Sequence, residues 1–419
     1  MFLVASSDPP EAADRDGANA VRPLVASVLV LALTACGSDT EPAVDRVVED
    51  SAGVRIVTLA GTPDMEAPFA FPPEPLYRHG AAADDYMFSS VRRGILLGDG
   101  SAAVFDARNS ELVLLNPDGT FHSVLAPAGE GPGEVKMVTS MFTVGRDSIL
   151  VEDFFNARLT LFAGGAVART VSTRGPINDG LSTRGMDASG AMLMSSGSYR
   201  RGFPDEWLPG HMVRFDLDTG VADTVATYDY VPFRPPEGTP ENPFSHFGIA
   251  GAVGGEFLYG RTDTPELIWR RPDGSMRQIV RWEPGPVYPT EEHWEIFAAE
   301  LRETAPRHNP HAQTEEAIEE LVTSMLGRYR LEPDEPLPFF MTPRGDDEGR
   351  IWLGEYVVAY GGAAAASYRI LSSAGEWLGR LDVPDGLRIL DIAGGRVLGV
   401  VKDEMEVESA VVYELAAAG

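Results

Sequence analysis

The sequence predicts an all-β protein, a six-bladed β-propeller that carries one inserted α-helical hairpin. Short apolar runs alternate with turn signals along most of the 419 residues, and a unit of up to four such runs repeats six times. A β-sandwich is the alternative, but it would need fewer strands and no repeat. Turn glycines also recur about every 50 residues, with a last interval about twice as long. They are Gly119, Gly165, Gly220, Gly274 and Gly375.

The chain begins with a segment that predicts a bacterial lipoprotein signal. Residues 24–35 form an apolar run that is too short to span a bilayer as a helix but fits the core of a secretory signal. The run ends in Leu33-Thr34-Ala35-Cys36, which is similar to a lipobox, where a small residue precedes a lipidated cysteine. We expect a signal peptide at 1–35 and a lipid on Cys36. A cysteine that follows an apolar helix by chance is the alternative.

The residues around this signal refine the expected boundaries. A signal normally opens with a short basic region, whereas residues 1–20 are acidic, so we expect the true start near residue 21. Residues 36–52 are expected to form a lipidated tether, which two or more acyl chains would anchor stably. The Asp that retains lipoproteins at the inner membrane of enteric bacteria is missing at Ser38. We therefore expect the outer membrane, with the protein facing the periplasm or the exterior.

The propeller itself is expected at 53–415, and its first unit has the clearest pattern. Three turns built from Gly, Asp, Asn, Ser, Arg and Pro, at 98–100, 108–110 and 117–119, separate four apolar runs. The runs lie at 95–97, 102–105, 112–115 and 121–125.

Five further units follow. Their runs lie at 141–144, 148–152, 158–162 and 167–171, then 191–195, 212–216 and 221–226, then 255–259, 267–270 and 276–282, then 350–354, 367–371 and 377–381, then 388–392, 396–401 and 410–415. The last unit shows three runs only. We therefore expect residues 54–59 to supply its fourth strand and to close the ring.

The long interval between the fourth and fifth units predicts two helices within 289–330. Thr290 and Thr314 are expected N-caps, and glutamates follow each of them in the first turn. Apolar side chains then recur at helical spacing, so both helices are amphipathic and each needs a surface to cover. They are Trp294, Phe297, Ala298 and Leu301 in the first helix, and Ile318, Leu321, Val322 and Met325 in the second.

Composition excludes several classes of protein. The chain has 34 basic and 63 acidic residues, a formal net charge of −29 and a pI near 4.5. This balance argues against nucleic-acid binding, which depends on clustered basic charge. The mean hydropathy of −0.09 argues against a membrane protein with many spans. The single cysteine allows no intrachain disulfide, and we expect a monomer.

Three segments resemble a known family. They are Asp50 to Val57, the Gly129-Glu130-Gly131-Pro132-Gly133-Glu134 stretch, and the ending at 400–404 and 411–415. They are similar to six-bladed β-propeller lipoproteins of environmental bacteria, related to NHL-repeat propellers. The resemblance covers about residues 45–415 and implies the fold and an envelope location, with no settled activity. Val135 stands where an aromatic residue is usual, and the helical hairpin is not part of the bare repeat. The Gly-Glu stretch lacks the Lys-Ser/Thr of a phosphate loop and is predicted to be an inter-blade turn.

The sequence favours a non-catalytic scaffold that binds a protein or a saccharide. Two loops, 199–210 and 228–247, are longer than hairpin turns and rich in proline and aromatic residues, and long loops on a rigid scaffold commonly carry binding surfaces. No catalytic residue is assigned, because the chain has no G-x-S-x-G, paired cysteines or H-E-x-x-H. The candidate ligand-binding residues are Tyr199, Trp207, Tyr230 and His246.

A metal-dependent lactonase or esterase is the alternative. Six-bladed propellers with these activities hold calcium on the axis through Glu, Asn and Asp side chains. We expect no cofactor for the scaffold, and calcium as the only cofactor for the enzyme. The candidate calcium ligands are Asp106, Asp153, Asn156 and Glu355. Three or more such side chains converging on the axis would favour the enzyme, and apolar or scattered polar groups there would favour the scaffold.

Overall fold

The computed structural model describes residues 46–80, 84–175, 180–197, 207–231, 240–308, 314–358 and 365–418, with the backbone only at 306–308. The expected signal peptide and Cys36 lie outside these residues. No helix within the described ranges is long and apolar enough to cross a membrane.

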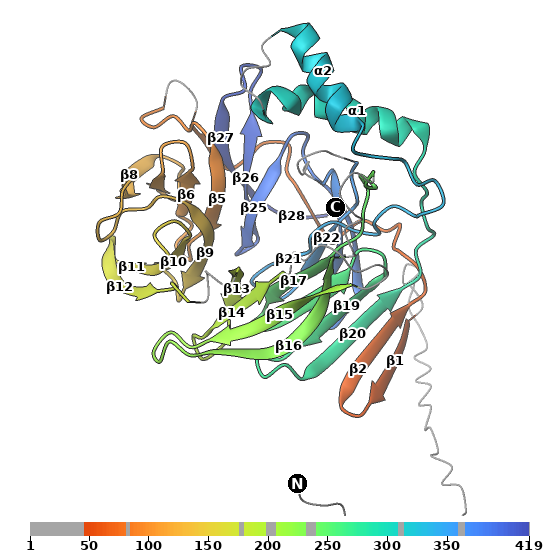
Figure 1. Cartoon of the computed structure of the whole chain (residues 1–419). Coiled ribbons are helices and arrows are strands. Elements are labelled where there is room, and N and C mark those ends of the chain that lie inside the picture. The colour runs from red at the N-terminus through yellow and green to blue at the C-terminus, as the bar shows by residue number, and fades with distance from the viewer. Residues whose placement is uncertain are drawn as a thin grey trace, which may run out of the picture. The chain divides into compact units, whose positions relative to one another are not determined.

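Six four-stranded antiparallel sheets form the blades of a propeller, as the sequence predicts (Figure 1). The first strand of each four-stranded repeat is the innermost one, with blade 6 taking its outermost strand from an earlier part of the chain. Inner strands of neighbouring blades contact one another around the axis, from blade 6 through blades 1 to 5. Blade 1 contains β5 (Val91–Leu96), β6 (Ala102–Asp106), β7 (Glu111–Leu115) and β8 (Phe121–Ala126). Blade 2 contains β9 (Val138–Val144), β10 (Ser148–Asp153), β11 (Arg158–Ala163) and β12 (Ala166–Ser172).

The remaining blades repeat this order. Blade 3 contains β13 (Leu181–Met186), β14 (Met192–Ser196), β15 (Leu208–Phe215) and β16 (Ala222–Val231), and blade 4 contains β17 (Gly248–Val253), β18 (Glu256–Arg261), β19 (Glu266–Arg270) and β20 (Met276–Trp282). Blade 5 contains β21 (Arg344–Gly345), β22 (Ile351–Gly354), β23 (Ser367–Leu371) and β24 (Trp377–Asp382). Blade 6 contains β25 (Arg388–Ala393), β26 (Arg396–Lys402) and β27 (Glu408–Glu414).

The ring closes through a strand other than the one the sequence predicts. β4 (Tyr77–His79) pairs antiparallel with β27 and is the fourth strand of blade 6, so the expectation for residues 54–59 is wrong. Those residues form β2 (Val54–Leu59), which pairs parallel with β20 at the outer edge of blade 4. Their apolar side chains are buried there: Val57 and Leu59 join the core that Trp269, Trp282 and Trp377 share between blades 4 and 5.

The folded part also begins earlier than the expected boundary at residue 53. β1 (Arg46–Ser51) lies within the segment 36–52 that we expected to be a tether, and it pairs with β2 as a hairpin. All six residues of β1 are exposed. The hairpin thus extends blade 4 to six strands. A short pair, β3 (Phe69–Ala70) with β28 (Ala416–Ala417), joins the chain end to the segment between β2 and β4.

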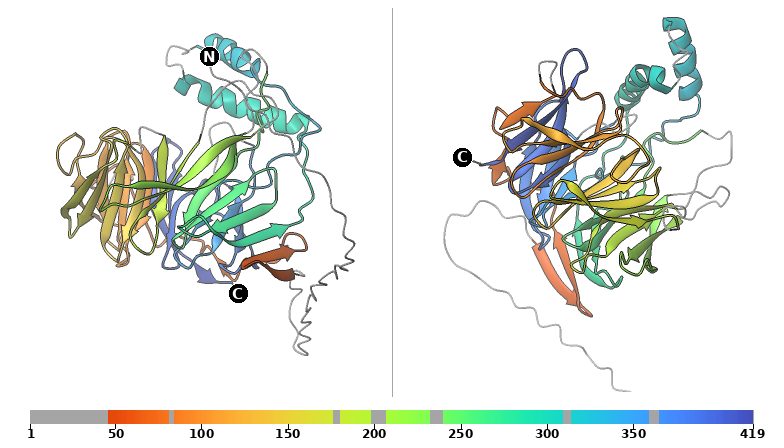
Figure 2. Two further views of the ribbon diagram at one scale, coloured as in Figure 1. Left: turned by 60° about the horizontal axis from the view of Figure 1, so that its bottom comes forward. Right: turned by 90° about the vertical axis from the view of Figure 1, so that its left-hand side faces the viewer.

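Two helices follow blade 4, as expected for 289–330. They are α1 (Glu291–His308) and α2 (Glu315–Leu326), and they lie outside the sheets in every view (Figures 1 and 2). The hydroxyl of Thr314 accepts a hydrogen bond from the Ala317 amide at 3.2 Å and caps α2. The helices pack on each other through Leu301, Ala305, Val322 and Met325, while Phe297 of α1 packs on Phe244 and Leu337.

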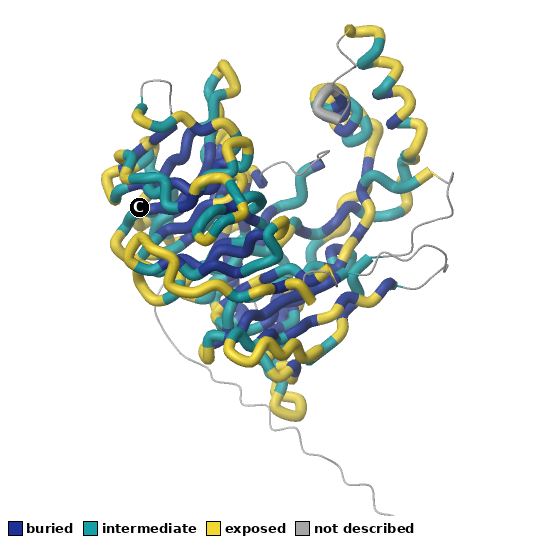
Figure 3. The backbone as a smooth tube through the Cα atoms, turned by 60° about the vertical axis from the view of Figure 1, so that its left-hand side comes forward, coloured by how far each residue is buried: buried dark blue, intermediate teal, exposed yellow. Residues whose placement is uncertain are grey.

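Buried residues follow the strands of the blades, whereas exposed residues gather at the turns and on the helices (Figure 3). Because the strands of each blade are antiparallel, the connection between its second and third strands emerges at the same end of the axis as the connection to the next blade. We call this end the loop face. Its described parts include 107–110, 127–137, 154–157, 283–308 and 314–343.

Candidate functional site

A concave site lies between the helical hairpin and blade 5. This hairpin pocket has a volume of about 530 Å³. The chain segments that precede and follow the helices form the floor of the pocket. There the Leu337 amide donates to the Val287 carbonyl at 2.7 Å, and the Phe339 amide donates to the Thr262 carbonyl at 2.8 Å. Most of the walls are apolar or aromatic: Val287, Ile296, Leu337, Phe339, Tyr356 and Val358.

A charged pair provides the polar wall of the hairpin pocket. Glu355 accepts from Arg369 Nη2 at 2.8 Å and from the Ser367 hydroxyl at 2.5 Å, and Arg380 lies 3.4 Å from the same carboxylate. The Glu355 and Arg369 side chains are each 28% exposed. Burial raises the pKa of the neighbouring Tyr356 to about 12, so its hydroxyl keeps its proton at neutral pH. The pocket thus presents an aromatic wall beside donors and acceptors fixed by an ion pair.

The candidate binding residues of the long loops do not form one site. Trp207 stacks under the Arg261 guanidinium, whose carbon lies 4.1 Å from the ring centroid, and Arg261 also pairs with Asp229 and Asp263. Tyr230 lies at the same end of blade 3 and packs edge-on against Tyr228. Both candidates therefore take part in contacts between blades 3 and 4. Tyr199 lies outside the described residues.

His246, the fourth candidate, contacts the segment that follows α2. It is buried, and its Nε2 lies 3.5 Å from Glu335 of the segment that follows α2. Its Nδ1 is buried without a hydrogen-bond partner among the described residues. Asn242 donates to the other oxygen of Glu335 at 2.8 Å. His246 therefore links the entry of blade 4 to the helical insertion.

The side chains that we considered as calcium ligands form hydrogen bonds to other groups of the protein. Asp106 accepts hydrogen bonds from the amides of Ser89 and Ser90 at 2.8 and 3.0 Å, and from Asn109 Nδ2 at 3.1 Å. Asp153 occupies the equivalent position in blade 2. It accepts from the amides of Lys136 and Met137 and from Asn156.

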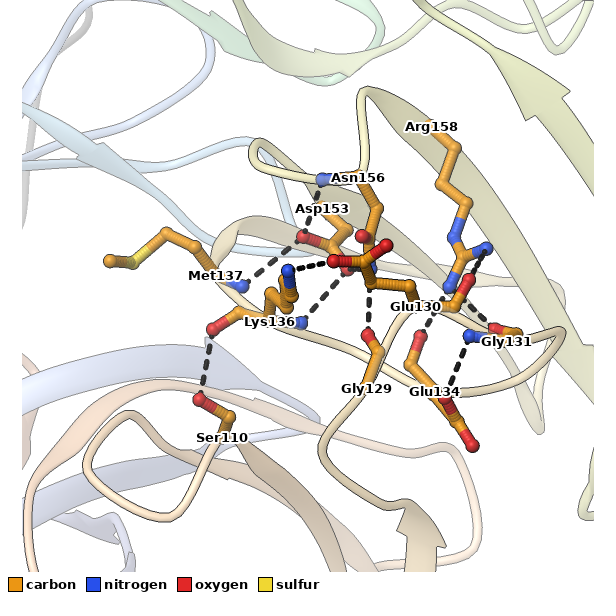
Figure 4. A network of polar contacts seen from close by, with 10 residues as sticks. All are labelled: Ser110, Gly129, Glu130, Gly131, Glu134, Lys136, Met137, Asp153, Asn156 and Arg158. Atoms are coloured by element: carbon orange, nitrogen blue, oxygen red, sulfur yellow. Dashed lines mark hydrogen bonds and ion pairs between the residues drawn. The ribbon is translucent and has the colours of Figure 1, made fainter.

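Figure 4 shows this second network together with the Gly-Glu stretch. Arg158 donates to the carbonyls of Glu130, Gly131 and Glu134 at 2.7 to 3.1 Å, and the Gly131 amide donates to the Glu134 carboxylate at 2.6 Å. The stretch connects β8 to β9, so the prediction of an inter-blade turn is confirmed. Asp153 and Asn156 hold this turn against blade 2.

The inner strands carry several basic side chains, which would disfavour a calcium site on the axis. Four inner strands carry arginines, which are Arg92, Arg93, Arg344 and Arg388 near the strand starts and Arg184 in the middle of β13. Within the described ranges, no group of three or more His, Cys, Asp or Glu side chains is placed to hold a metal ion. The donor set therefore does not fit an axial calcium, and we derive no catalytic step through one.

Comparisons with known proteins give only distant structural likenesses. No protein-family model matches the sequence, and no curated protein matches it. Among solved structures, the chain is similar to a DUF4221 family member from Bacteroides vulgatus, with 10% identity, a TM-score of 0.47, and coverage of 90% of this chain and 99% of that one. A Bacteroides fragilis protein named as an inferred exported protein gives 12% identity, a TM-score of 0.44, and coverage of 87% and 100%. The calcium-binding protein regucalcin from Agrobacterium tumefaciens gives 12% identity, a TM-score of 0.38, and coverage of 84% and 97%. At these values the likenesses carry no inference about function.

Proposed function

We propose that the protein is a lipid-anchored, non-catalytic binding propeller of the cell envelope, and that the hairpin pocket takes a saccharide. The apolar run that ends at Cys36 supports the anchor, and the resemblance to lipoprotein propellers supports the location. The observation that carries the binding role is the pocket itself. Its volume of about 530 Å³ lies in the range of small-ligand sites.

The chemistry of the pocket favours a saccharide over a protein partner. A sugar ring has an apolar face that packs on an aromatic side chain such as Tyr356, and hydroxyl groups that bind to fixed charges such as the Glu355–Arg369 pair. A protein interface of ordinary size is broader and does not need a concavity of this kind. The helical hairpin, which the repeat itself does not require, forms one wall of the pocket.

The test compares two tyrosines of the same face. Tyr356 lines the hairpin pocket, whereas Tyr288 is 49% exposed and does not. We expect full-length protein in non-ionic detergent to bind one of a panel of envelope-derived oligosaccharides in calorimetric titration. Tyr356→Leu should raise the Kd about tenfold through loss of the aromatic contact, and Tyr288→Leu should leave it unchanged.

Circular dichroism of both variants checks that the fold is intact. If no oligosaccharide binds, and an envelope protein is instead retained by the wild type and released by Tyr356→Leu, the pocket is a protein-binding site and the saccharide proposal fails. Equal oligosaccharide affinities for the two variants would also exclude the hairpin pocket as the binding site.

A further inference from the structure

The mouth of the propeller axis carries a cluster of arginines that the proposed function does not use. Each inner strand begins at the loop face, so residues at its start lie near that end of the axis. Arg344 and Arg388 are the first residues of β21 and β25, Arg92 and Arg93 follow the first residue of β5, and Arg184 is in β13. We call these five side chains the axial arginines. None of them lines the hairpin pocket.

Hydrogen bonds fix three of the axial arginines to neighbouring strands. Arg93 Nε donates to the Thr139 carbonyl of β9 at 2.6 Å, and Arg388 Nη2 donates to the Val91 carbonyl of β5 at 2.6 Å. Arg184 Nε donates to the Ser195 hydroxyl at 2.7 Å. Each of these guanidiniums has five N–H donors, so most of its donors stay available.

The axial arginines lack the partners that other arginines of this chain have. Arg214, Arg261, Arg277 and Arg350 all form ion pairs with carboxylates. Within the described part of the chain, by contrast, no axial arginine lies at ion-pair distance from a carboxylate. Since the protein has 63 acidic residues, this concentration of arginines without ion pairs is not a consequence of composition.

Three carboxylates that interact with the axial arginines accept hydrogen bonds from neutral donors. Glu152 accepts from the hydroxyls of Thr139 and Thr183 at 2.9 and 2.8 Å, and Glu408 accepts from the Val91 amide at 2.5 Å. Asp391 accepts from the Leu96 amide at 2.8 Å, and burial raises the pKa of its carboxyl group. These groups therefore offset the five positive charges only in part.

Burial and repulsion within the cluster lower the pKa of two of the axial arginines. Desolvation is the largest cause that lowers the pKa of Arg93 and of Arg388, and the charges of neighbouring axial arginines lower it further. The Glu408 carboxylate opposes the shift at Arg388, and Glu152 opposes it at Arg93. Arg92, Arg93 and Arg184 nevertheless remain accessible to solvent. Charges that are partly desolvated, mutually repelling and accessible are stabilised when an anion binds between them.

We propose that the axial arginines form a binding site for an oxyanion group, a phosphate or a sulfate, at the loop-face end of the propeller axis. Such a group offers several oxygen acceptors and negative charge, which match guanidiniums that four blades place on their inner strands. The group can belong to a free inorganic ion or to a phosphorylated or sulfated molecule. This site is independent of the hairpin pocket.

The test measures binding of inorganic phosphate and sulfate to the full-length protein in non-ionic detergent, by calorimetry and by the change in Tm. Chloride at the same ionic strength is the reference. Glucose 6-phosphate distinguishes a free ion from a phosphate ester. We expect phosphate or sulfate to raise the Tm in a saturable way, because an anion that binds only the native state stabilises it.

Arg344→Gln is the decisive variant. It should raise the Kd for the anion about tenfold to a hundredfold, and in chloride its Tm should equal or exceed that of the wild type, because a repelling charge is removed. Arg108→Gln is the matched control: Arg108 is exposed on a loop-face turn, and its side chain forms no ion pair among the described residues. Absence of a phosphate or sulfate effect beyond chloride would overturn the proposal, as would equal anion affinities for the two variants.

Discussion

Aspartates fix many of the turns between strands in this protein. Asp187 accepts hydrogen bonds from the amides of Ser189 and Ala191 at 2.8 and 3.0 Å and from Arg214 Nε at 2.7 Å. Burial alone would raise the pKa of Asp187, but these bonds outweigh it and hold the pKa below its usual range. The same shift occurs at Asp99, Asp118, Asp216 and Asp273, where hydrogen bonds from nearby Ser or Thr lower the pKa.

These shifts predict a loss of stability in acid. A carboxylate whose pKa is lowered on folding stabilises the folded state above its unfolded-state pKa, and this contribution disappears as the pH falls through the folded-state value. Asp187→Asn should therefore reduce the free energy of unfolding by about 1–3 kcal/mol at about pH 7. The difference from the wild type should narrow below about pH 4.

Urea unfolding at several pH values measures this difference. Asp223→Asn, on an exposed position of β16, is the control and should be close to wild type throughout. A difference for Asp187→Asn that stays constant from neutral to acid pH would show that the charge of Asp187 is not what stabilises its turn.

Single residues also explain why the candidate site was only partly predictable. Asp106, Asp153 and Asn156 are the residue types of a calcium site, and they lie at strand ends as such ligands do. The structure gives the carboxylate oxygens of the two aspartates to backbone amides, and the Asn156 side-chain nitrogen donates to Gly129 and Asp153. A sequence does not distinguish an Asp that caps a turn from one that binds a metal, because both are short polar residues at strand ends. The hairpin pocket was not predicted either, since its walls come from segments far apart in the chain.

The closing strand β4 shows how a short element holds the ring. Tyr77 and His79 are buried while Arg78 between them is exposed. Tyr77 packs against the turn between β7 and β8, where Gly119 has a φ of 83° and its amide donates to Asn116. A Cβ atom at Gly119 would lie 2.4 Å from the Tyr77 ring. Glycine is thus required at this turn both for its backbone conformation and for the contact that joins blade 6 to blade 1.

Two glycine variants separate these requirements. Gly165, in the turn between β11 and β12, has a similar φ of 77° but no atom within 4 Å of an added Cβ. Gly165→Ala should therefore cost only the backbone strain, about 1–2 kcal/mol. Gly119→Ala should cost about 2–4 kcal/mol because the Tyr77 ring must also move.

Denaturant unfolding of the two variants gives the comparison, and the double variant Gly119→Ala, Tyr77→Leu should recover part of the extra loss. Equal losses for Gly119→Ala and Gly165→Ala would mean that the Tyr77 contact does not contribute to ring closure.

The sequence correctly predicts the elements that have a clear apolar pattern and that pack in the unit to which their place in the chain assigns them. The second and third strands of all six blades, the fourth strands of blades 1 to 5, and both helices fall in this class. The inner strands β13, β17 and β21 were missed: polar residues interrupt β13, two glycines interrupt β17, and β21 has only two residues. β4 was missed because it has only three residues, one of them exposed. The clearly apolar β2, which we expected to close blade 6, pairs with blade 4.

Charge is distributed unevenly over the molecule. The chain carries a net charge of −29, yet the start of its inner strands is basic. Acidic residues elsewhere pair with arginines or fix turns, so the negative excess belongs to the body of the protein and not to the axis. This distribution keeps nonspecific polyanions away from the surface while leaving one position where a small anion is favoured.

The same distribution predicts the response to calcium. The axis offers guanidiniums where a propeller hydrolase needs carboxylates, and no metal-binding group of His, Cys, Asp or Glu occurs within the described ranges. We therefore expect the Tm of the full-length protein to be unchanged by a chelator and by micromolar calcium. Millimolar calcium should act only by screening the acidic surface, so magnesium at the same concentration should have an equal effect. A saturable rise in Tm with calcium that magnesium does not reproduce would contradict this expectation and restore a metal-dependent activity to the propeller.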